Sequence, residues 1–217
     1  MTSADSSRPC DAVVVDLQDV FGGIDIYLFD QILRRRIVSR DRIVDAGCGH
    51  GRNLVFLLRE GYDVSGADAD PDAIREVQAL AARLAPALPA DHFRCEPIEA
   101  MTFPAGTATV VISSAVLHFA RDDAQFEAML AGSWRLLASG GMFFCRLAST
   151  IGLETEVRPL APGSRRHRLP DGTDRYLVDE ALLMALTARL GGRLLDPIKT
   201  TVVQGQRAMT TWVVRKD

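Results

Sequence analysis

The sequence lacks the features that mark several classes of protein. Its 217 residues include only four cysteines, and no two of them have the C-x-x-C spacing of a zinc or redox site. No run of about 18 apolar residues is present, so no membrane span is expected. The formal net charge is −3, which provides no global basic field for nucleic acid. These absences argue against a disulfide framework, a metal site, a nucleic-acid partner and a membrane partner.

The composition is that of an ordinary globular domain. Hydrophobic residues make up 47% and charged residues 24% of the chain. One domain is expected, because a single core is normally saturated only beyond about 250 residues. Residues 1–10 are small and polar and lack the apolar run of a signal peptide. We therefore expect a cytoplasmic protein, and the sequence leaves its oligomeric state open.

Short β-rich runs alternate with helical patterns along most of the chain. Strands are predicted at Arg42–Asp45, Tyr62–Ala67, His92–Cys95, Thr109–Ser113 and Met142–Leu147. Helices are predicted at Ala12–Val20, Ile24–Ile37, Arg52–Glu60, Asp122–Leu137, Val178–Leu190 and after a cap at Asp70. Two last β-rich runs, Arg193–Val203 and Ala208–Val214, have the spacing of a hairpin. The pattern predicts an α/β fold: a Rossmann-like, doubly wound, mostly parallel sheet with helices on both faces and a C-terminal antiparallel hairpin.

Within this single domain, 1–217, four parts are expected. Residues 1–40 would form N-terminal cap helices, and residues 41–149 the ligand-binding core. Residues 150–175 are rich in proline and glycine without a clear period, which is typical of a substrate-side insert. Residues 176–217 would supply the closing helix and the hairpin.

The most informative stretch is Val44–Arg52, V-D-A-G-C-G-H-G-R. A strand ends, three glycines follow at alternate positions, and a helix begins. Glycines there allow a sharp turn and close approach of the backbone to a ligand. Asp68 follows at the end of the next strand, where a carboxylate can accept both hydroxyls of a ribose. The pattern predicts a nucleoside-containing ligand.

Two nucleoside ligands compete for this loop. The dinucleotide fingerprint is G-x-G-x-x-G, whereas this chain has G-x-G-x-G. Asp45 also stands at the entry of the loop, where a carboxylate repels a pyrophosphate and attracts an ammonium group. S-adenosylmethionine has an ammonium group and no phosphate, and the residues favour it over a dinucleotide.

The motif D-A-G-C-G-H-G closely resembles the first motif of class I S-adenosylmethionine-dependent methyltransferases. The resemblance continues, in order, through Gly66-Ala67-Asp68, Glu96–Phe103, the strand I-S-S-A-V-L-H-F and L-L-A-S-G-G-M-F-F. It covers about Ile43 to Leu147. The helix start G-R-N and the later G-Y-D-V also resemble methyltransferases of the tellurite-resistance type.

The resemblance implies a set of cofactor-binding residues. Asp45 would organise the loop and the methionine ammonium, Asp68 would take the ribose hydroxyls, and backbone near Ile98 and Glu99 would read the adenine edge. The full set is Asp45, Gly47, Cys48, Gly49, Arg52, Asn53, Asp68, Ala69, Ile98, Glu99 and Ser113. One departure is Glu96-Pro97, where the family often has Asp-Ala, because Pro97 has no N–H to donate.

On the acceptor side the sequence offers four candidates. His118 follows the fourth strand and is either a general base or a half-buried structural histidine. Arg165 and Arg166 would hold an anionic acceptor or lie in a solvated loop. Tyr27 would line the site or pack in the core. No metal ligands are expected.

We therefore expect a methyltransferase that moves a methyl group from S-adenosylmethionine to a small-molecule acceptor by in-line displacement, giving S-adenosylhomocysteine. The alternative is a protein, or partner subunit, that binds S-adenosylmethionine without turnover. The acceptor atom, whether oxygen, nitrogen, sulfur or a metalloid, is not determined by the residues.

Overall fold

The structure is a computed structural model that describes residues 15–217. The polar tail 1–10 with Cys10, and the beginning of the helix expected at Ala12, lie outside the described residues. Within residues 15–217, no helix is both long and apolar enough to cross a membrane.

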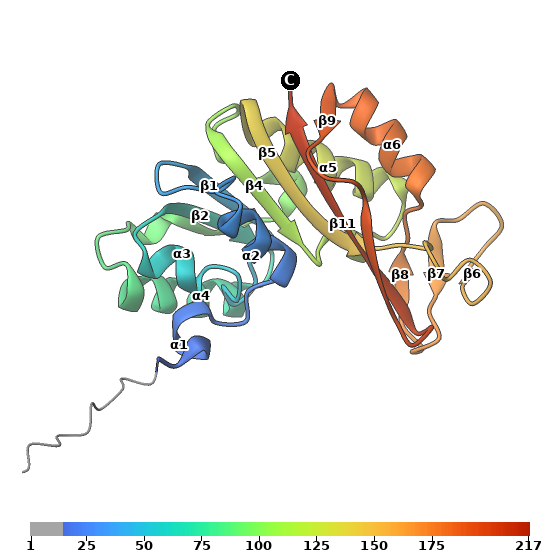
Figure 1. Ribbon diagram of the computed structural model, residues 1–217, viewed down its shortest axis with the longest axis horizontal. Helices are drawn as coiled ribbons and strands as arrows, with labels where there is room; N and C mark the ends of the chain where they lie inside the picture. Colours follow the sequence, from blue (N-terminus) through green and yellow to red (C-terminus); the bar gives the residue numbers. More distant parts are fainter. Residues whose placement is uncertain (1–14) are drawn as a thin grey trace, which may run out of the picture.

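A central sheet runs through the molecule in the order β10-β11-β5-β4-β1-β2-β3, with β9 also paired to β11 (Figure 1). The strands from β1 to β5 pair in parallel, and β11 runs antiparallel to β5. The fold class predicted from the sequence is thereby confirmed. The strands are β1 (Arg42–Ala46), β2 (Asp63–Asp68), β3 (Phe93–Cys95), β4 (Ala108–Ser114), β5 (Leu137–Ala148), β9 (Gly192–Leu194), β10 (Lys199–Val203) and β11 (Arg207–Lys216).

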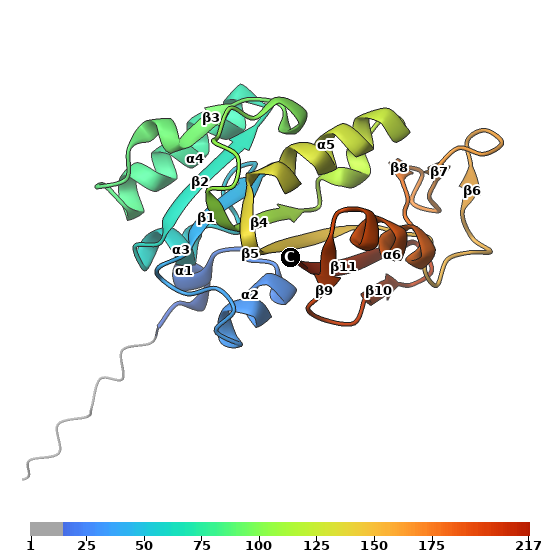
Figure 2. The same cartoon turned by 90° about the horizontal axis from the view of Figure 1, so that it is seen from above.

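Helices cover both faces of this sheet because its inner strands are apolar on both sides. On β4, Val111 packs in one core cluster with residues of α5 and α6, whereas Val110 and Ile112 pack in a second cluster with residues of α2, α3 and α4. Figure 2 shows α5 and α2 on opposite sides of β4 and β5. The helices are α1 (Leu17–Phe21), α2 (Ile26–Leu33), α3 (Val55–Arg59), α4 (Pro71–Leu84), α5 (Asp123–Leu136) and α6 (Glu180–Arg189), with short 3₁₀ turns η1 (Ala90–His92), η2 (Ile98–Ala100) and η3 (Leu117–Phe119).

Helix α4 illustrates how local sequence sets an element. Asp70 accepts a hydrogen bond from the backbone N–H of Asp72 at 2.8 Å, and Pro71 occupies the first turn. The buried residues Ala73, Ile74, Val77 and Ala81 form its inner face. The cap predicted at Asp70 is confirmed.

Several predicted boundaries are wrong. The first three helices are shorter than expected; α2, for example, begins after its cap Asp25 and stops at Leu33. Arg35 then adopts a left-handed φ of 57°, and Arg34 and Arg36 turn to pair with Asp196. The strand expected at Arg193–Val203 is split into β9 and β10, since Pro197 has no N–H to contribute to a ladder. Strand β5 begins at Leu137, ahead of the start predicted at Met142.

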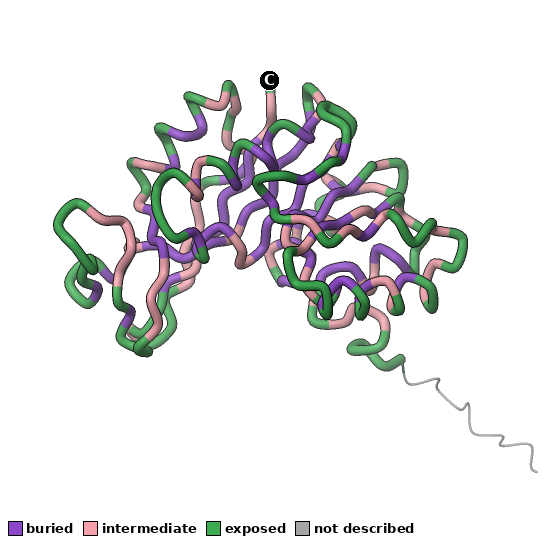
Figure 3. The backbone as a smooth tube through the Cα atoms, turned by 180° about the vertical axis from the view of Figure 1, so that it is seen from behind, coloured by how far each residue is buried: buried purple, intermediate pink, exposed green. Residues whose placement is uncertain are grey.

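The insert 150–175 also contains more order than its sequence suggests. It carries most of a separate three-stranded antiparallel sheet, made of β6 (Arg158–Pro159), β7 (Arg166–Arg168) and β8 (Asp174–Tyr176). This small sheet stands beyond the end of the central sheet (Figure 1), and Figure 3 shows that burial is concentrated along the central strands. The insert therefore adds ordered structure beyond the carboxyl ends of the parallel strands.

Candidate functional site

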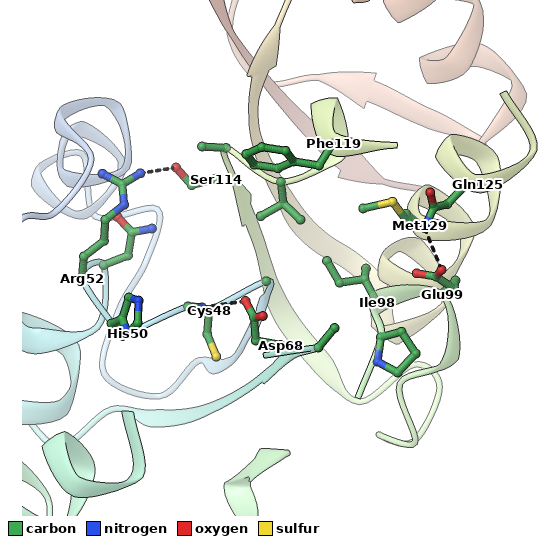
Figure 4. A pocket seen from close by; sticks show the side chains of 17 residues that line it. Cys48, His50, Arg52, Asp68, Ile98, Glu99, Ser114, Phe119, Gln125 and Met129 are labelled. Atoms are coloured by element: carbon green, nitrogen blue, oxygen red, sulfur yellow. Dashed lines mark hydrogen bonds between the residues drawn. The ribbon is translucent and has the colours of Figure 1, made fainter. Parts of the chain in front are cut away.

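The main cavity, of about 510 Å³, lies at the carboxyl ends of β1, β2 and β4. This is the switch point of the sheet, where β1 is flanked by β2 on one side and β4 on the other. We call it the glycine-loop cavity. Figure 4 shows the side chains that surround it; the lining residues are Gly47, Cys48, Gly49, His50, Arg52, Asn53, Asp68, Ala69, Pro97, Ile98, Glu99, Ser114, Ala115, Val116, Phe119, Gln125 and Met129.

The loop after β1 is held in shape by backbone contacts. The N–H groups of Gly47 and Cys48 both donate to the carbonyl of Ala67, at 2.8 and 3.1 Å. Gly47 has a φ of 91°, and a Cβ placed on it would lie 2.4 Å from a methyl carbon of Val116. Only glycine fits this position, so the loop can pass closely beneath the cavity.

Asp68 is held at the end of β2 with its carboxylate at the cavity. One oxygen accepts from the N–H of Gly49 at 2.9 Å, and the other accepts from the N–H of Asp70 at 3.0 Å. In Figure 4 this side chain lies across the cavity from Phe119. The two backbone bonds fix the carboxylate and leave it further lone pairs for a ligand.

Asp45 lies on β1, beneath the loop. It is fully buried, and neither of its carboxylate oxygens has a hydrogen-bond partner among the described residues. Burial raises the pKa of Asp45 to about 7; the charge of Arg52 acts in the opposite direction and that of Asp68 adds to the rise. A buried carboxylate without a partner is costly, so this position favours a cationic or hydrogen-bond-donating ligand group.

A buried polar network borders the cavity on the side of the N-terminal cap. The carboxylate of Asp25 accepts from Arg146 at 2.9 Å and from the hydroxyl of Ser114 at 3.2 Å. The N–H of Asp25 donates to the side-chain oxygen of Asn53 at 3.0 Å, and Arg52 donates to Ser114 at 3.3 Å. The network joins α2, the glycine loop, β4 and β5.

Most of the cofactor-binding residues expected from the sequence are brought together here. All line the glycine-loop cavity except Asp45 and Ser113. Ser113 is fully buried, and its neighbour Ser114 lines the cavity in its place. Strand alternation explains the shift, because successive side chains point to opposite faces. Burial raises the pKa of the Cys48 thiol, consistent with a residue that fills the loop.

The acceptor-side candidates are dispersed. Tyr27 lies outside this cavity, with its hydroxyl 2.7 Å from that of Thr201. Arg165 pairs with Asp179 at 2.9 Å, and Arg166 donates to the carbonyl of Ala120 at 3.2 Å. Neither arginine lines the glycine-loop cavity. Instead of lying in a loop, Arg166 begins β7 of the small sheet, and Arg165 directly precedes it.

His118 is buried beside the cavity rather than in it. Its Nδ1 accepts from the N–H of Ala148 at 3.3 Å. Burial, with added effects of Arg175 and Arg146, lowers the pKa of His118 to about 4. The ring is therefore neutral at pH 7 and carries its proton on Nε2. It can donate a hydrogen bond but is a weak base.

Sequence reasoning missed Asp25, Ser114, Ala115 and Arg146. Ala115 adopts a left-handed φ of 64° directly after β4, an uncommon conformation for a residue with a Cβ. Its N–H donates to the carbonyl of Arg146 at 2.7 Å. Nothing local in the sequence marks these residues, although the buried β4 pointed to this strand end.

A glycine loop and two carboxylates at the switch point of a doubly wound sheet are typical of α/β proteins that bind nucleoside-containing ligands. Residues 43–141 match the model of a family described as a methyltransferase domain. Among curated proteins, the chain is similar to the uncharacterized methyltransferase YodH of Bacillus subtilis (strain 168), with 27% identity over 141 residues, or 64% of this chain and 54% of YodH. The chain thus spans about half the length of this relative.

Solved structures share the fold. A SAM-dependent methyltransferase from Methanosarcina mazei has a TM-score of 0.68 and 19% identity, covering 85% of this chain and 96% of that one. A 1,6-didemethyltoxoflavin-N1-methyltransferase from Burkholderia thailandensis has a TM-score of 0.66 and 19% identity, covering 93% and 81%. Residues 43–141 thus resemble a methyltransferase domain, and the fold is that of S-adenosylmethionine-dependent methyltransferases; the resemblance to the class I family predicted from the sequence is confirmed. The narrower likeness to the tellurite-resistance type stays a prediction.

Proposed function

We propose that this protein transfers a methyl group from S-adenosylmethionine to a small molecule and releases S-adenosylhomocysteine. The observation that supports this most directly is the buried, unpartnered carboxylate of Asp45 beneath the glycine loop. An ammonium group held at the loop above Asp45 would compensate its carboxylate directly or through water, whereas a pyrophosphate would be repelled by both Asp45 and Asp68. The methionine part of S-adenosylmethionine carries that ammonium group, so the residues fit it better than a dinucleotide.

The remaining lining residues also fit the parts of S-adenosylmethionine. Gly47 and Gly49 would lie against the methionine part, and the fixed carboxylate of Asp68 would accept the ribose hydroxyls. Ala69 and Ile98 would lie on either side of the adenine. Because Pro97 has no N–H to donate, backbone groups nearer Glu99 would bind the adenine edge. Every one of these residues lines the cavity.

When bound, S-adenosylmethionine would supply an electrophilic methyl group to a lone pair of the acceptor, and the electrons of the S–CH₃ bond would stay on sulfur. The protein would hold the acceptor in line with the methyl group. Ser114, Ala115 and Val116 form the wall at the end of β4, and Phe119 adds an apolar side. Holding two reactants in line can contribute about 7–11 kcal/mol.

Of the two roles that the sequence leaves open for His118, general base and half-buried structural histidine, this mechanism uses the second. Its Nδ1 is occupied by the N–H of Ala148, and its pKa is lowered to about 4. A proton lost by the acceptor would pass to solvent or to another group. This assignment favours acceptors that are already nucleophilic at neutral pH.

The comparisons support the proposal without naming the acceptor. YodH is described as a methyltransferase, and the Burkholderia protein is described with a bound small molecule and S-adenosylhomocysteine. This chain shares the fold of the second protein, and the main cavity lies at the switch point.

Calorimetry with S-adenosylmethionine, S-adenosylhomocysteine and NAD tests the proposal. We expect the first two to bind and NAD not to bind. Asp68→Ala should weaken binding of S-adenosylmethionine at least tenfold, because charge-assisted hydrogen bonds are lost. The matched control is Asp63→Ala, at the opposite end of the same strand β2, which should change nothing. Preference for NAD would overturn the proposal.

Transfer itself is tested with labelled methyl groups and fractionated small-molecule pools. Label recovered in a small-molecule product would support the enzyme. Tight binding of S-adenosylmethionine without transfer to any pool would favour the non-catalytic alternative.

A further inference from the structure

A second cavity, of about 260 Å³, shares the lining residue Ala115 with the glycine-loop cavity. Ala115 lines both cavities, so its left-handed backbone forms part of the wall between them. We call this second space the arginine cavity. It is lined by Ala115, His118, Arg146, Ala148, Leu169, Asp171, Thr173, Arg175, Val203, Arg207 and Met209.

The structure assigns the arginine cavity as the binding site for an oxyanionic group, a carboxylate or phosphate, of the methyl acceptor. That the ligand is a methyl acceptor rests on the proposed function, whereas its negative charge follows from the charges of the cavity itself. The position of the cavity favours this use, since a molecule held there borders the strand end where Ser114 and Ala115 line the glycine-loop cavity.

The charge of the cavity is predominantly positive. Arg146, Arg175 and Arg207 line it together with the carboxylate of Asp171. Because Arg146 is paired with Asp25 behind the cavity, the excess positive charge comes from Arg175 and Arg207. Among the ion pairs within residues 15–217, neither Arg175 nor Arg207 has a carboxylate partner within 4 Å. Such a concentration of arginine is unexpected in a chain with net charge −3, and guanidinium groups match carboxylate and phosphate oxygens well.

Two of these arginines are held in place by contacts with other residues of the protein. Arg146 pairs with the buried Asp25 at 2.9 Å and lies over the ring of Tyr27 at 5.4 Å. Arg175 lies over the ring of Phe119 at 4.9 Å and donates to the backbone carbonyl of Asp174. Because these contacts fix the side chains before a ligand arrives, less conformational entropy is lost on binding.

The arginine charges also act on two titratable groups that line the cavity and belong to different elements. The charges of Arg175 and Arg146 add to burial in lowering the pKa of His118. The pKa of Asp171 is lowered first by its hydrogen bonds to Thr173, and the charges of Arg175 and Arg207 contribute further. His118 and Asp171 come from η3 and from the turn before β8.

The size of the cavity limits the ligand. Pockets for drug-sized molecules have volumes of about 300–1,000 Å³, and this cavity is smaller. Leu169, Val203 and Met209 give it an apolar portion beside the arginines. A metabolite-sized acceptor with one oxyanion and a short apolar body fits this lining.

The test measures binding of 4-fluorobenzoate by fluorine NMR to the full chain saturated with S-adenosylhomocysteine, which occupies the first cavity. We expect 4-fluorobenzoate to bind and the neutral analogue 4-fluorobenzamide not to bind. Competition with inorganic phosphate distinguishes a general oxyanion site from one that selects carboxylates. Rising salt should weaken binding, because the attraction is electrostatic.

The variant Arg175→Gln/Arg207→Gln should bind 4-fluorobenzoate at least tenfold more weakly, with unchanged affinity for S-adenosylhomocysteine. The matched control is Arg158→Gln, an exposed arginine on β6 that lines neither cavity, which should bind normally. If the double variant loses S-adenosylhomocysteine binding, the two single variants are compared instead.

Equal binding of the amide, or unchanged binding by the arginine variants, would overturn the inference. So would absence of binding by both 4-fluorobenzoate and phosphate in a protein that binds S-adenosylhomocysteine. If S-adenosylhomocysteine itself does not bind, the proposed function fails, and the same titrations on the free protein still decide whether the arginine cavity takes oxyanions.

Discussion

The two cavities that share Ala115 are built in different ways. The glycine-loop cavity takes much of its lining from the loop after β1 and the ends of β2 and β4, and its shape depends on glycine backbone. The arginine cavity takes its arginines from β5, β8 and β11, which are far apart in the sequence. One site is a local motif placed by the sheet, whereas the other exists only because the insert and the hairpin meet.

This difference indicates where specificity resides. Residues of the first cavity fit a ligand that many relatives of the fold would share. Those of the second come from the insert and from strands outside the glycine motif, so they are free to differ between proteins of the same fold. The following substitutions separate the two sites, beginning with the largest expected effect.

Gly47→Ala should damage the first cavity most. The new Cβ would lie 2.4 Å from Val116, at a backbone φ of 91°. Steric overlap and left-handed strain together should cost about 2–5 kcal/mol of unfolding free energy. Binding of S-adenosylmethionine should also be lost. Urea denaturation and calorimetry measure the two effects.

Its control is Gly106→Ala, which has a φ of 67° and open space where the new Cβ would lie. That change should cost only the strain, about 1–2 kcal/mol. Equal losses for both variants would show that Val116 does not restrict the loop.

Asp25→Asn, at the boundary between the two cavities, should lower the free energy of unfolding by about 2–3 kcal/mol, because Arg146 loses a buried counter-ion. Asp30→Asn removes a partly exposed Asp–Arg pair from the same helix and should cost less than about 0.5 kcal/mol. Unfolding free energies of the two variants give the comparison. Similar small losses would mean that the Asp25–Arg146 pair is not structurally important.

Asp45 should make ligand affinity and stability depend on pH in opposite directions. Its pKa is raised by burial to about 7, so the folded chain holds this proton more tightly than the unfolded chain. Its contribution to stability is therefore fully present below about pH 4 and is lost as the pH rises through about 7. Binding of an ammonium group needs the ionised form, so affinity for S-adenosylmethionine should fall about tenfold from pH 8 to pH 6.

Calorimetry across this range measures the effect, and Asp45→Asn should bind weakly with no such dependence. A flat profile in the unsubstituted protein would contradict the raised pKa or the contact with the ammonium group.

Ala115→Gly should have the smallest effect. Glycine relieves the left-handed strain at a φ of 64° but adds entropy to the unfolded chain, so we expect a net stabilisation of about 0.5 kcal/mol. Gln204→Gly, at a φ of 48° in the β10–β11 turn, is the control and should behave alike. Destabilisation by Ala115→Gly alone, seen in thermal unfolding, would show that the methyl group packs the wall between the cavities.

The extent of sequence-based prediction differs between the two sites for a physical reason. Gly47, Gly49 and Asp68 could be found because turn chemistry and strand ends leave local signals. The sequence predicts Ser113 rather than Ser114, because the face of a strand end cannot be read without its neighbours. Arg165 and Arg166 are adjacent and therefore stand out in the sequence as basic residues. The second cavity is nevertheless lined by Arg146 and Arg175. Isolated arginines in β-rich runs carry no such signal.

The sequence by itself determined the alternation of strands and helices, the glycine loop and the two carboxylates that favour an ammonium and a ribose. These depend on local backbone chemistry and on hydrophobic periodicity. Only the tertiary structure decided that Asp25 holds Arg146, that Ala115 separates two cavities, and that arginines from three strands converge. Those features depend on long-range packing, in which the partner of each side chain lies far away in the sequence.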